Sequence, residues 1–474
     1  MKRLLCLLIL FSLSVASFSH PWKPRHYVII DTDAGIDDMK AISLLLASPD
    51  VRVVAVTVSP GALNANTAYL KVRSLLDSYF HEGVPVGINR TSAFKSPDFQ
   101  TALNTVWGDE NRVNSRDAAE SISLLKDILA VEKNKIEFLC LGSMSTLERV
   151  LAGQPSIKDV IKHVFWSNSA PGNKKDFNYN IDPDAAEKVL KSGLPLTFVN
   201  NSFAFKLYDS KLISRVRETS SVYAKKLGQL LDNEAVKRHD FVYRMADDAV
   251  PLLLHYPDVF TFRKAGNGDE ALIADTVQAR EMMLKILKGE TVERNQVVKE
   301  FPTDPAFYFS DIEGSVTDII SKYGNDEWTS GVLANELHRH LGVFAIVGVK
   351  MGIRAREYFA TGVDEFSVVS SAGSVPPLSC MNDGLQVSTG ATPGHGLLKV
   401  RNDLPAPSAE FSYLNQKIKL TLKPEIASLI TNELKEINFV HGLDSDIYWE
   451  LVRKNSIKYW LNLDRHDIFI IEKL

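Results

Sequence analysis

The sequence has few cysteines and no dense run of basic residues. Only three of its 474 residues are cysteines, and Cys6 lies in the N-terminal segment. The remaining two, Cys140 and Cys380, can form at most one bridge, so a disulfide framework is excluded. Lys and Arg number 54 against 58 Asp and Glu, which gives a net charge of -4. A nucleic-acid partner is therefore not expected, and we expect a small-molecule substrate instead.

Long apolar runs are also lacking, apart from Leu4–Leu13. Lys2 and Arg3 precede this run and small residues follow it up to Ser19, which is the layout of a secretory signal peptide over residues 1–20. The run is too short to span a bilayer stably. We expect cleavage near residue 17 or 19, export to the periplasm or the extracellular space, and no stable membrane span after cleavage. A short buried N-terminal helix is the alternative.

Apolar strands alternate with amphipathic helices from residue 26 to about residue 325. The strands are expected at residues 26–30, 51–58, 136–142, 163–166 and 194–199. This pattern predicts an α/β fold with an open, mostly parallel sheet and helices on both faces. Ligands bind such sheets at the carboxyl ends of the strands.

A second domain is expected after the turn-forming stretch KYGNDEWTSG at residues 322–331. We therefore predict one domain over residues 24–327 and a smaller α+β domain over 331–474. A helical run at 337–358 precedes a Gly-, Ser- and Pro-rich stretch there. The amphipathic segments at 415–474 are assigned to packing or to contacts in a homo-oligomer.

Four aspartates follow the first strand in DTDAGIDD: Asp31, Asp33, Asp37 and Asp38. Carboxylates so close raise one another's pKa unless a cation compensates them. Oxygen ligands favour calcium or magnesium, and several of them favour calcium. In the alternative, Asp37 or Asp38 merely caps a helix that begins near Met39.

A phosphatase is the other functional interpretation of this acidic run. Asp31 and Asp33 form an Asp-x-Asp pair, in which the first aspartate of a metal-dependent phosphatase is the nucleophile. That hypothesis leaves Asp37 and Asp38 unexplained, so it is weaker.

The acidic run resembles the N-terminal signature of the inosine-uridine-preferring nucleoside hydrolases. Three later stretches match that family in order: LGSMSTL (141–147), GNKKDFNYNIDPDAA (172–186) and ADDAVPLLLHYP (246–257). The resemblance extends over residues 25–325. It implies hydrolysis of the N-glycosidic bond of purine or pyrimidine ribonucleosides to ribose and free base.

The resemblance also implies a calcium site. The ligands would be Asp33, Asp38, Asp247 and the backbone carbonyl of Ser145. Asp248 takes the place of Asp247 if its loop is one residue shorter than the family's. Asp33 would also orient and deprotonate a water on the metal.

For the sugar, the resemblance implies that Asp37 holds ribose hydroxyls and that Asn173, Asp176 and Asn178 contact the rest of the ring. Carboxylates and amides suit this chemistry because the departing base leaves an oxocarbenium-like sugar with positive charge. An Asn- and Asp-rich turn is the alternative for this stretch. Asp182, before a proline, is expected to cap a helix.

One departure from the family concerns the leaving base. Ala246 replaces a histidine that can protonate the base, so another acid such as Tyr243 or His163, or a good leaving group, is needed. Without one, the protein is a catalytically weak binder of ribose or nucleosides. Trp166 and Trp107 are candidates for stacking on the base, with a core position as the alternative.

The C-terminal stretches ELHRHLGVFAIVGVKMGIRARE (336–357) and SCMNDGLQVSTGATPGHG (379–396) resemble a subunit family of formylmethanofuran dehydrogenase. The resemblance points to a second metal at His338, His340 and Cys380, with His395 as a further candidate. Two imidazoles and a thiolate suit zinc. Solvated histidines and a buried thiol are the alternative.

Overall fold

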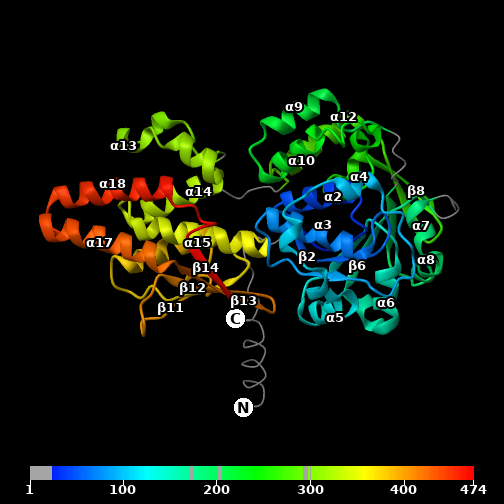
Figure 1. Cartoon of the computed structure of the whole chain (residues 1–474), viewed down its shortest axis with the longest axis horizontal. Helices are drawn as coiled ribbons and strands as arrows, with labels where there is room; N and C mark the ends of the chain where they lie inside the picture. Colours follow the sequence, from blue (N-terminus) through cyan, green and yellow to red (C-terminus); the bar gives the residue numbers. More distant parts are fainter. Residues whose placement is uncertain (1–23, 171–175, 200–204, 292–296, 299) are drawn as a thin grey trace, which may run out of the picture.

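The computed structural model describes residues 24–170, 176–199, 205–291, 297–298 and 300–474. Two lobes lie side by side, with the N-terminal lobe on the right of Figure 1 and the C-terminal lobe on the left. The predicted signal peptide and Asn173 lie outside the described residues. No helix among the described residues is long and apolar enough to cross a membrane.

The N-terminal lobe contains a nine-stranded sheet in the order β4-β3-β2-β1-β5-β6-β7-β9-β8. All neighbouring strands are parallel except β8 and β9, which are antiparallel. The strands are β1 (His26–Thr32), β2 (Val51–Val58), β3 (Val86–Ile88), β4 (Ala119–Glu120), β5 (Ile136–Cys140), β6 (Ile161–Ser167), β7 (Leu196–Val199), β8 (Phe260–Ala265) and β9 (Gly268–Ile273). The predicted open, mostly parallel sheet is confirmed.

Helices cover both faces of this sheet because alternate side chains of each strand enter different cores. On β1, Val28 and Ile30 belong to one buried cluster and Ile29 to the other. The helices are α2 (Ile36–Ala47), α3 (Ala65–Ser78), α4 (Gln100–Asn104), α5 (Ser121–Val131), α6 (Ser145–Gly153), α7 (Phe177–Ile181), α8 (Pro183–Leu190), α9 (Ser210–Glu218), α10 (Val222–Asp232), α11 (Ala249–His255) and α12 (Thr276–Leu287).

The C-terminal lobe is the predicted smaller α+β domain. Its five-stranded sheet has the order β11-β10-β12-β13-β14 and is antiparallel except between β10 and β11. Its strands are β10 (Ser367–Ser370), β11 (Leu398–Val400), β12 (Ser408–Tyr413), β13 (Gln416–Leu422) and β14 (Phe469–Lys473). Its helices are α13 (Ser310–Glu313), α14 (Val316–His338), α15 (Val343–Phe359), α16 (Met381–Thr389), α17 (Pro424–His441) and α18 (Asp446–Asn462).

The predicted linker at residues 322–331 is instead part of helix α14. Trp328 is fully buried and stacks on Trp460 of α18 at 5.1 Å between ring centroids. Gly324, with a φ of 87°, breaks the helix once without ending it. Ile312, before the predicted boundary, belongs to the same buried cluster as Trp328 and Trp460. The C-terminal unit therefore begins ahead of residue 331.

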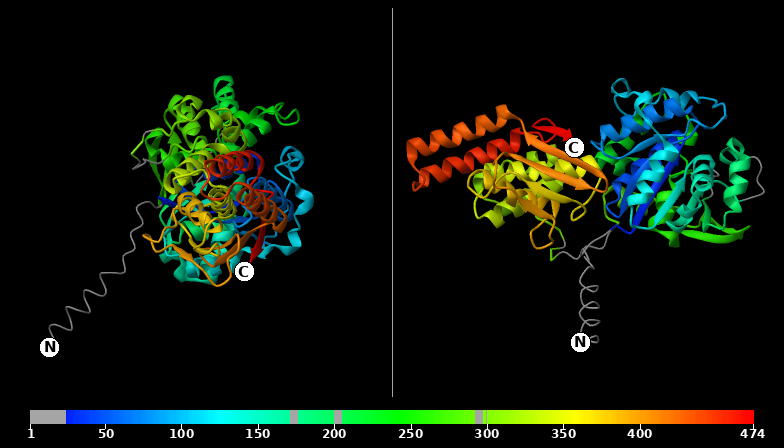
Figure 2. Two further views of the ribbon diagram at one scale, coloured as in Figure 1. Left: turned by 90° about the vertical axis from the view of Figure 1, so that its left-hand side faces the viewer. Right: turned by 90° about the horizontal axis from the view of Figure 1, so that it is seen from below.

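The two lobes meet at a loop after α3. The backbone N–H of Gly83 donates to the Tyr358 carbonyl at 2.8 Å, and His81 Nδ1 lies 2.6 Å from the Glu357 carbonyl. Phe80 stacks on His466 with ring centroids 3.5 Å apart. The right-hand view of Figure 2 shows the two lobes side by side. Their association thus rests on backbone hydrogen bonds as well as on side chains.

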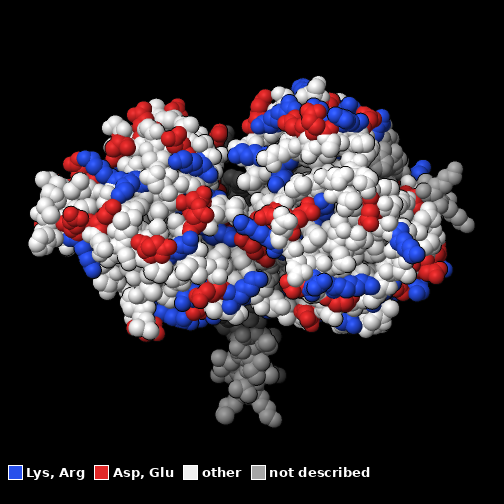
Figure 3. Space-filling view, in the orientation of Figure 1, with Lys and Arg blue, Asp and Glu red and all other residues white. Residues whose placement is uncertain are grey.

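Charges are distributed without a dominant basic patch. Figure 3 shows Lys and Arg interspersed with Asp and Glu over both lobes on the visible face. Among the described residues, Cys140 and Cys380 are free and buried, and they lie in different lobes. No bridge therefore links the two lobes through this pair.

Candidate active site and metal centre

The acidic run lies at the carboxyl end of β1. Helix α2 begins at Ile36, with Gly35 as its N-cap and without a capping side chain. Asp37 and Asp38 therefore lie inside the first turn, and the expectation that one of them caps a helix beginning near Met39 is wrong. The first turn suits them because the positive end of the helix dipole stabilises carboxylates there.

Asp31 is held by the neighbouring strand. It is fully buried, and its two carboxylate oxygens accept hydrogen bonds from Thr57 Oγ1 at 2.6 Å and Ser59 Oγ at 2.8 Å. Burial nevertheless raises the pKa of Asp31 to about 6. With both oxygens engaged by hydroxyls of β2 and the turn after it, Asp31 positions the acidic run.

Asp33 lies beside Asp38 in a space closed by backbone. The N–H of Asp33 donates to Asp38 Oδ1 at 3.2 Å, and Thr32 Oγ1 donates to the same oxygen at 2.6 Å. A Cβ at Gly61 would lie 2.0 Å from Asp33 Oδ2, so only glycine leaves this carboxylate in place. A Cβ at Gly142 would lie 3.4 Å from the same oxygen.

Asp247 reaches the cluster from the loop before α11. Ser167, the last residue of β6, donates to Asp247 Oδ1. Carboxylate oxygens of Asp37, Asp38 and Asp247 all lie within 4.8 Å of one another. The neighbouring Asp248 is engaged elsewhere, since Lys40 Nζ lies 2.8 Å from its Oδ2.

These carboxylates lack a compensating charge of their own. Burial, with the negative charges of Asp37 and Asp247, raises the pKa of Asp33 to about 7. Burial also raises the pKa of Asp38 and of Asp247 well above the ordinary range, and neighbouring aspartates add to it. Burial raises the pKa of Asp37 as well, against the opposing effect of Lys40, which is already paired with Asp248.

The donor set fits a divalent cation. Converging carboxylates that are destabilised in the ionised form are stabilised by a hard ion with oxygen ligands. Two of the predicted calcium ligands, Asp38 and Asp247, belong to the converging trio. Its third member is half-buried Asp37, and the predicted ligand Asp33 is not one of the three. Asp33 adjoins the trio through its N–H bond to Asp38.

Ser145 begins α6 near Asp33. Its hydroxyl lies 2.8 Å from Ser143 Oγ and accepts a hydrogen bond from Asn89 Nδ2 at 3.3 Å. Asn89 was not among the predicted site residues. Its position directly after the apolar strand β3, at the same edge of the sheet, is the signal that could have identified it.

Two of the predicted sugar contacts stabilise the loops around the cluster. Asp176 is the N-cap of α7, and its Oδ2 accepts from the Ser169 N–H at 2.9 Å. Buried Asn178 donates from Nδ2 to the carbonyls of Leu141 and Ser167, at 2.7 and 2.8 Å. The expectation for Asp182 is confirmed, since it caps α8 through the Ala185 N–H.

The two tryptophans are core residues. Trp166 has no exposed surface, and its indole N–H donates to the Gly142 carbonyl at 2.9 Å. Trp107 is 2% exposed within the core. Neither ring has a face available for stacking on a base, so the core alternative applies to both.

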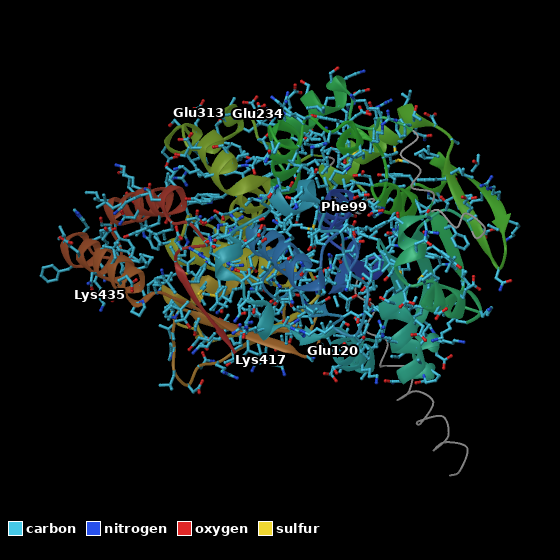
Figure 4. All side chains as sticks on the ribbon, turned by 45° about the vertical axis from the view of Figure 1, so that its right-hand side comes forward. Phe99, Glu120, Glu234, Glu313, Lys417 and Lys435 are labelled. Carbon is cyan, nitrogen blue, oxygen red and sulfur yellow. The ribbon has the colours of Figure 1, made fainter. Side chains whose placement is uncertain are left out.

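Exposed aromatic rings lie elsewhere beside the site. Phe177, between Asp176 and Asn178, is 39% exposed, and Phe99 is 48% exposed with ring centroids 5.6 Å apart. The Phe99 N–H donates to the Ala62 carbonyl in the loop that adjoins Asp33. Phe99 is labelled in Figure 4. The sequence pattern did not single out either ring, because lone phenylalanines outside strands are common.

Neither proposed acid for the leaving base lies at the cluster. His163 is near the start of β6, at the opposite edge of the sheet, and its Nε2 lies 2.9 Å from Thr197 Oγ1. The Tyr243 hydroxyl donates to the Leu231 carbonyl of α10 at 3.4 Å. The expectation for His163 is wrong because parallel strands place their two ends at different edges.

In the C-terminal lobe, His338 and His340 lie together with ring centroids 4.2 Å apart. His338 Nδ1 pairs with Asp383 Oδ2 at 2.7 Å. Burial, with the Asp383 charge, raises the pKa of the Cys380 thiol to about 11. The described residues contain no group of three metal-ligand atoms within 4.8 Å here. His395 is distant from them, with Nδ1 at 3.2 Å from Asp364 Oδ1.

An open parallel sheet with carboxylates converging at its carboxyl edge is typical of α/β enzymes that bind a small ligand there. A family model described as inosine-uridine preferring nucleoside hydrolase matches residues 28–303, more than half of the chain. The chain belongs to this family and is therefore a metal-dependent hydrolase of N-glycosyl bonds. A second model, FmdE of the molybdenum formylmethanofuran dehydrogenase operon, matches residues 337–436.

The chain is also similar to individual proteins. The chain is 26% identical over 220 residues to the pyrimidine-specific ribonucleoside hydrolase RihA of Shewanella oneidensis, covering 43% of this chain and 68% of that protein. It is 25% identical over 254 residues to the inosine-uridine preferring nucleoside hydrolase of Leishmania major, covering 49% and 80%. The solved inosine-uridine preferring nucleoside hydrolase of Bacillus anthracis is 16% identical with a TM-score of 0.45, covering 56% of this chain and 99% of that one.

Proposed function

We propose that the protein hydrolyses ribonucleosides to ribose and free base in a calcium-dependent reaction. The observation that supports this is the convergence of Asp37, Asp38 and Asp247 beside Asp33. When bound, calcium keeps these carboxylates ionised and lowers the pKa of a coordinated water. We further propose export by way of the N-terminal segment, as its charge and apolar pattern suggest.

Asp33 is the group that removes a proton from the attacking water. Its Oδ2 lies next to Gly61 and Gly142, and its N–H bond to Asp38 places it beside the converging carboxylates, so it is positioned to accept a proton from a water held there. The water oxygen then bonds to C1′ of the ribose while the bond from C1′ to the base nitrogen breaks, and its electron pair leaves with the base. The nearby carboxylates stabilise the positive charge on the sugar.

The remaining residues hold the substrate. Half-buried Asp37 accepts hydrogen bonds from ribose hydroxyls, and the Oδ1 of Asn178 is the acceptor left over after its two Nδ2 bonds. Phe99 and Phe177 provide the apolar surface against which the base packs. As the family resemblance implies, Asn173 contacts the sugar and the backbone carbonyl of Ser145 is a calcium ligand.

The leaving base receives its proton from solvent, because His163 and Tyr243 are engaged away from the cluster. We therefore expect activity to depend strongly on the leaving group. A nitrophenyl riboside should be hydrolysed faster than natural nucleosides, because its leaving group, nitrophenolate, departs without protonation.

The experiment is a ribose-release assay on the metal-loaded full chain with a panel of purine and pyrimidine nucleosides and the nitrophenyl riboside. Ribose release that stops on calcium chelation and returns on calcium addition supports the proposal. No release from any substrate at high enzyme concentration contradicts it. Nucleoside binding by calorimetry without release would support the second candidate, a ribose-binding protein, which the replacement of the family histidine by Ala246 favours.

A further inference from the structure

A second group of potential metal ligands lies at the opposite edge of the large sheet. His26 opens β1, Asp50 precedes β2, and His255 ends α11. One ligand atom of each lies within 4.8 Å of the other two. Because the acidic cluster follows the carboxyl end of β1, this group belongs to a different region of the domain and takes no part in the chemistry described above.

The first histidine is oriented by a buried carboxylate. His26 Nδ1 lies 2.7 Å from Glu137 Oε2, and Glu137 is also paired with Lys162 at 2.8 Å. Although burial raises it, hydrogen bonds from His26 and Lys162 bring the pKa of Glu137 below its ordinary value. A carboxylate at Nδ1 accepts a proton from that nitrogen, so Nε2 is the nitrogen of His26 that remains for a metal ion. Metal-binding histidines are commonly oriented in this way.

The second histidine has an unsatisfied nitrogen. His255 Nε2 is buried and has no hydrogen-bond partner among the described residues, and its ring meets the His26 ring edge to face at 5.5 Å. A buried polar atom without a partner is costly, and a metal ion would satisfy it.

The third group supplies the negative charge. Asp50 is 2% exposed, and its Oδ1 accepts the Arg25 N–H at 2.8 Å. Its Oδ2 is 3.5 Å from Arg25 Nε, but the Arg25 side chain is 63% exposed. A metal ion would therefore displace only a solvent-exposed guanidinium from this oxygen, an interaction that contributes little.

We propose that His26, Asp50 and His255 form a binding site for a borderline divalent cation of the zinc class. Two imidazoles and a carboxylate suit zinc, whereas the all-oxygen cluster across the sheet suits a hard cation. The site joins the starts of β1 and β2 to the end of α11, whose first residues follow Asp247. Zinc here stabilises the helix that follows the loop carrying Asp247 of the acidic cluster.

The first experiment measures zinc per chain after the full chain is equilibrated with zinc and dialysed. His255→Gln and His26→Gln should each bind one zinc ion fewer than the wild type. His239→Gln, which changes an exposed histidine of the same domain, is the matched control and should bind as the wild type does. The series is repeated with His338→Ala and His340→Ala also present, so that the C-terminal histidines cannot account for the difference.

Glu137→Gln should keep the stoichiometry but weaken zinc binding about 10-fold, because it loosens the orientation of His26. Equal zinc content in wild type and His255→Gln, or no zinc in the wild type, would overturn the proposal.

A second experiment needs no variant and so remains decisive if a substitution unfolds the chain. Crystals of the zinc-equilibrated full chain should give an anomalous peak at the zinc absorption edge between His26 and His255. Absence of that peak overturns the proposal. Neither measurement depends on nucleoside hydrolysis, so the outcome is independent of the proposed function.

Discussion

The acidic cluster of the N-terminal lobe and the histidine pair of the C-terminal lobe are both candidate metal centres, but they are built differently. In the first, three carboxylates from two distant segments come within 4.8 Å of one another. In the second, His338 is already paired with Asp383, and the Cys380 thiol keeps its proton because burial raises its pKa to about 11.

The difference lies in what holds the ligands together. Parallel strands deliver their carboxyl ends to one edge, so Asp33 after β1 and Ser167 at the end of β6, which binds Asp247, are neighbours by topology. Like charges kept together in this way need a cation. His338 and His340 meet only because α14 ends between them at Arg339, with a φ of 67°. One nitrogen of this pair is partnered, His338 Nδ1 by Asp383, while His338 Nε2 is buried without a hydrogen-bond partner among the described residues.

The largest effect is expected from Asp33→Asn. The amide cannot accept the proton of the attacking water, so ribose release should fall about 1,000-fold. Asp182→Asn is the matched control, because asparagine also caps a helix and α8 should be unaffected. Steady-state ribose release of both variants is the measurement. Normal turnover by Asp33→Asn would show that the catalytic base is another residue.

The next largest effect is expected from acidification, which should destabilise the fold through a buried histidine at the contact between the lobes. His81 is 5% exposed, and its Nδ1 proton is donated to the Glu357 carbonyl, so Nε2 accepts from the Tyr223 hydroxyl. Burial lowers the pKa of His81 from 6.5 to about 4. Between these pH values the unfolded chain binds a proton at His81, whereas the folded chain does not. Stability is therefore lost as the pH falls, on the order of 3 kcal/mol.

The measurement is denaturant unfolding at pH 7 and pH 4.5. His81→Gln should lose less stability between the two pH values than the wild type, whereas His239→Gln, at an exposed position, should lose as much as the wild type. An equal loss in wild type and His81→Gln would mean that other groups account for the acid sensitivity.

A smaller effect is expected from Gly61→Ala, which adds a methyl group where Asp33 Oδ2 lies 2.0 Å away. Because the methyl group would also lie 2.6 Å from Asp33 Cβ, the backbone at Asp33 must shift and its carboxylate rotate. A displaced catalytic group of this kind costs about 100-fold in kcat. Gly228→Ala on α10 is the control, since its added Cβ would have its nearest neighbour at 3.9 Å. Unchanged kcat in Gly61→Ala would show that Asp33 tolerates the rotation.

The smallest effect sharpens the contrast between the two centres. Replacing His338 and His340 together by alanine should leave ribose release within about twofold of the wild type, because distant sites act independently. The same assay with calcium checks this. A large loss of activity would mean that the C-terminal pair is coupled to the acidic cluster.

Much of the large domain was predictable because its signals are local. Strand and helix periodicity indicates a parallel sheet, and Asp31–Asp38 is contiguous and follows a strand. The family resemblance was needed for Asp247, which is distant in sequence. Which carboxylates meet depends on side-chain packing, which brings Asp37 within 4.8 Å of Asp38 and Asp247.

Other expectations were wrong where tertiary packing decides. Trp166 looked available for a ligand, but Phe198 on the next strand and the Gly142 carbonyl enclose it. The stretch around Gly324 has the composition of a linker, yet Glu327 within it is buried against Lys350 of α15. Neither partner is visible in the local pattern of residues.

The contact between the lobes has a consequence for the sequence of the hydrolase domain. A Cβ at Gly83 would lie 2.7 Å from the Tyr358 carbonyl, and Phe80 adopts a φ of 60° beside His466. These residues of the hydrolase half are constrained by a domain that follows them by hundreds of positions. A hydrolase without the second domain would not have these contacts to satisfy. The segment around residues 80–83 should therefore serve as a signature by which fused architectures are recognised from their N-terminal halves alone.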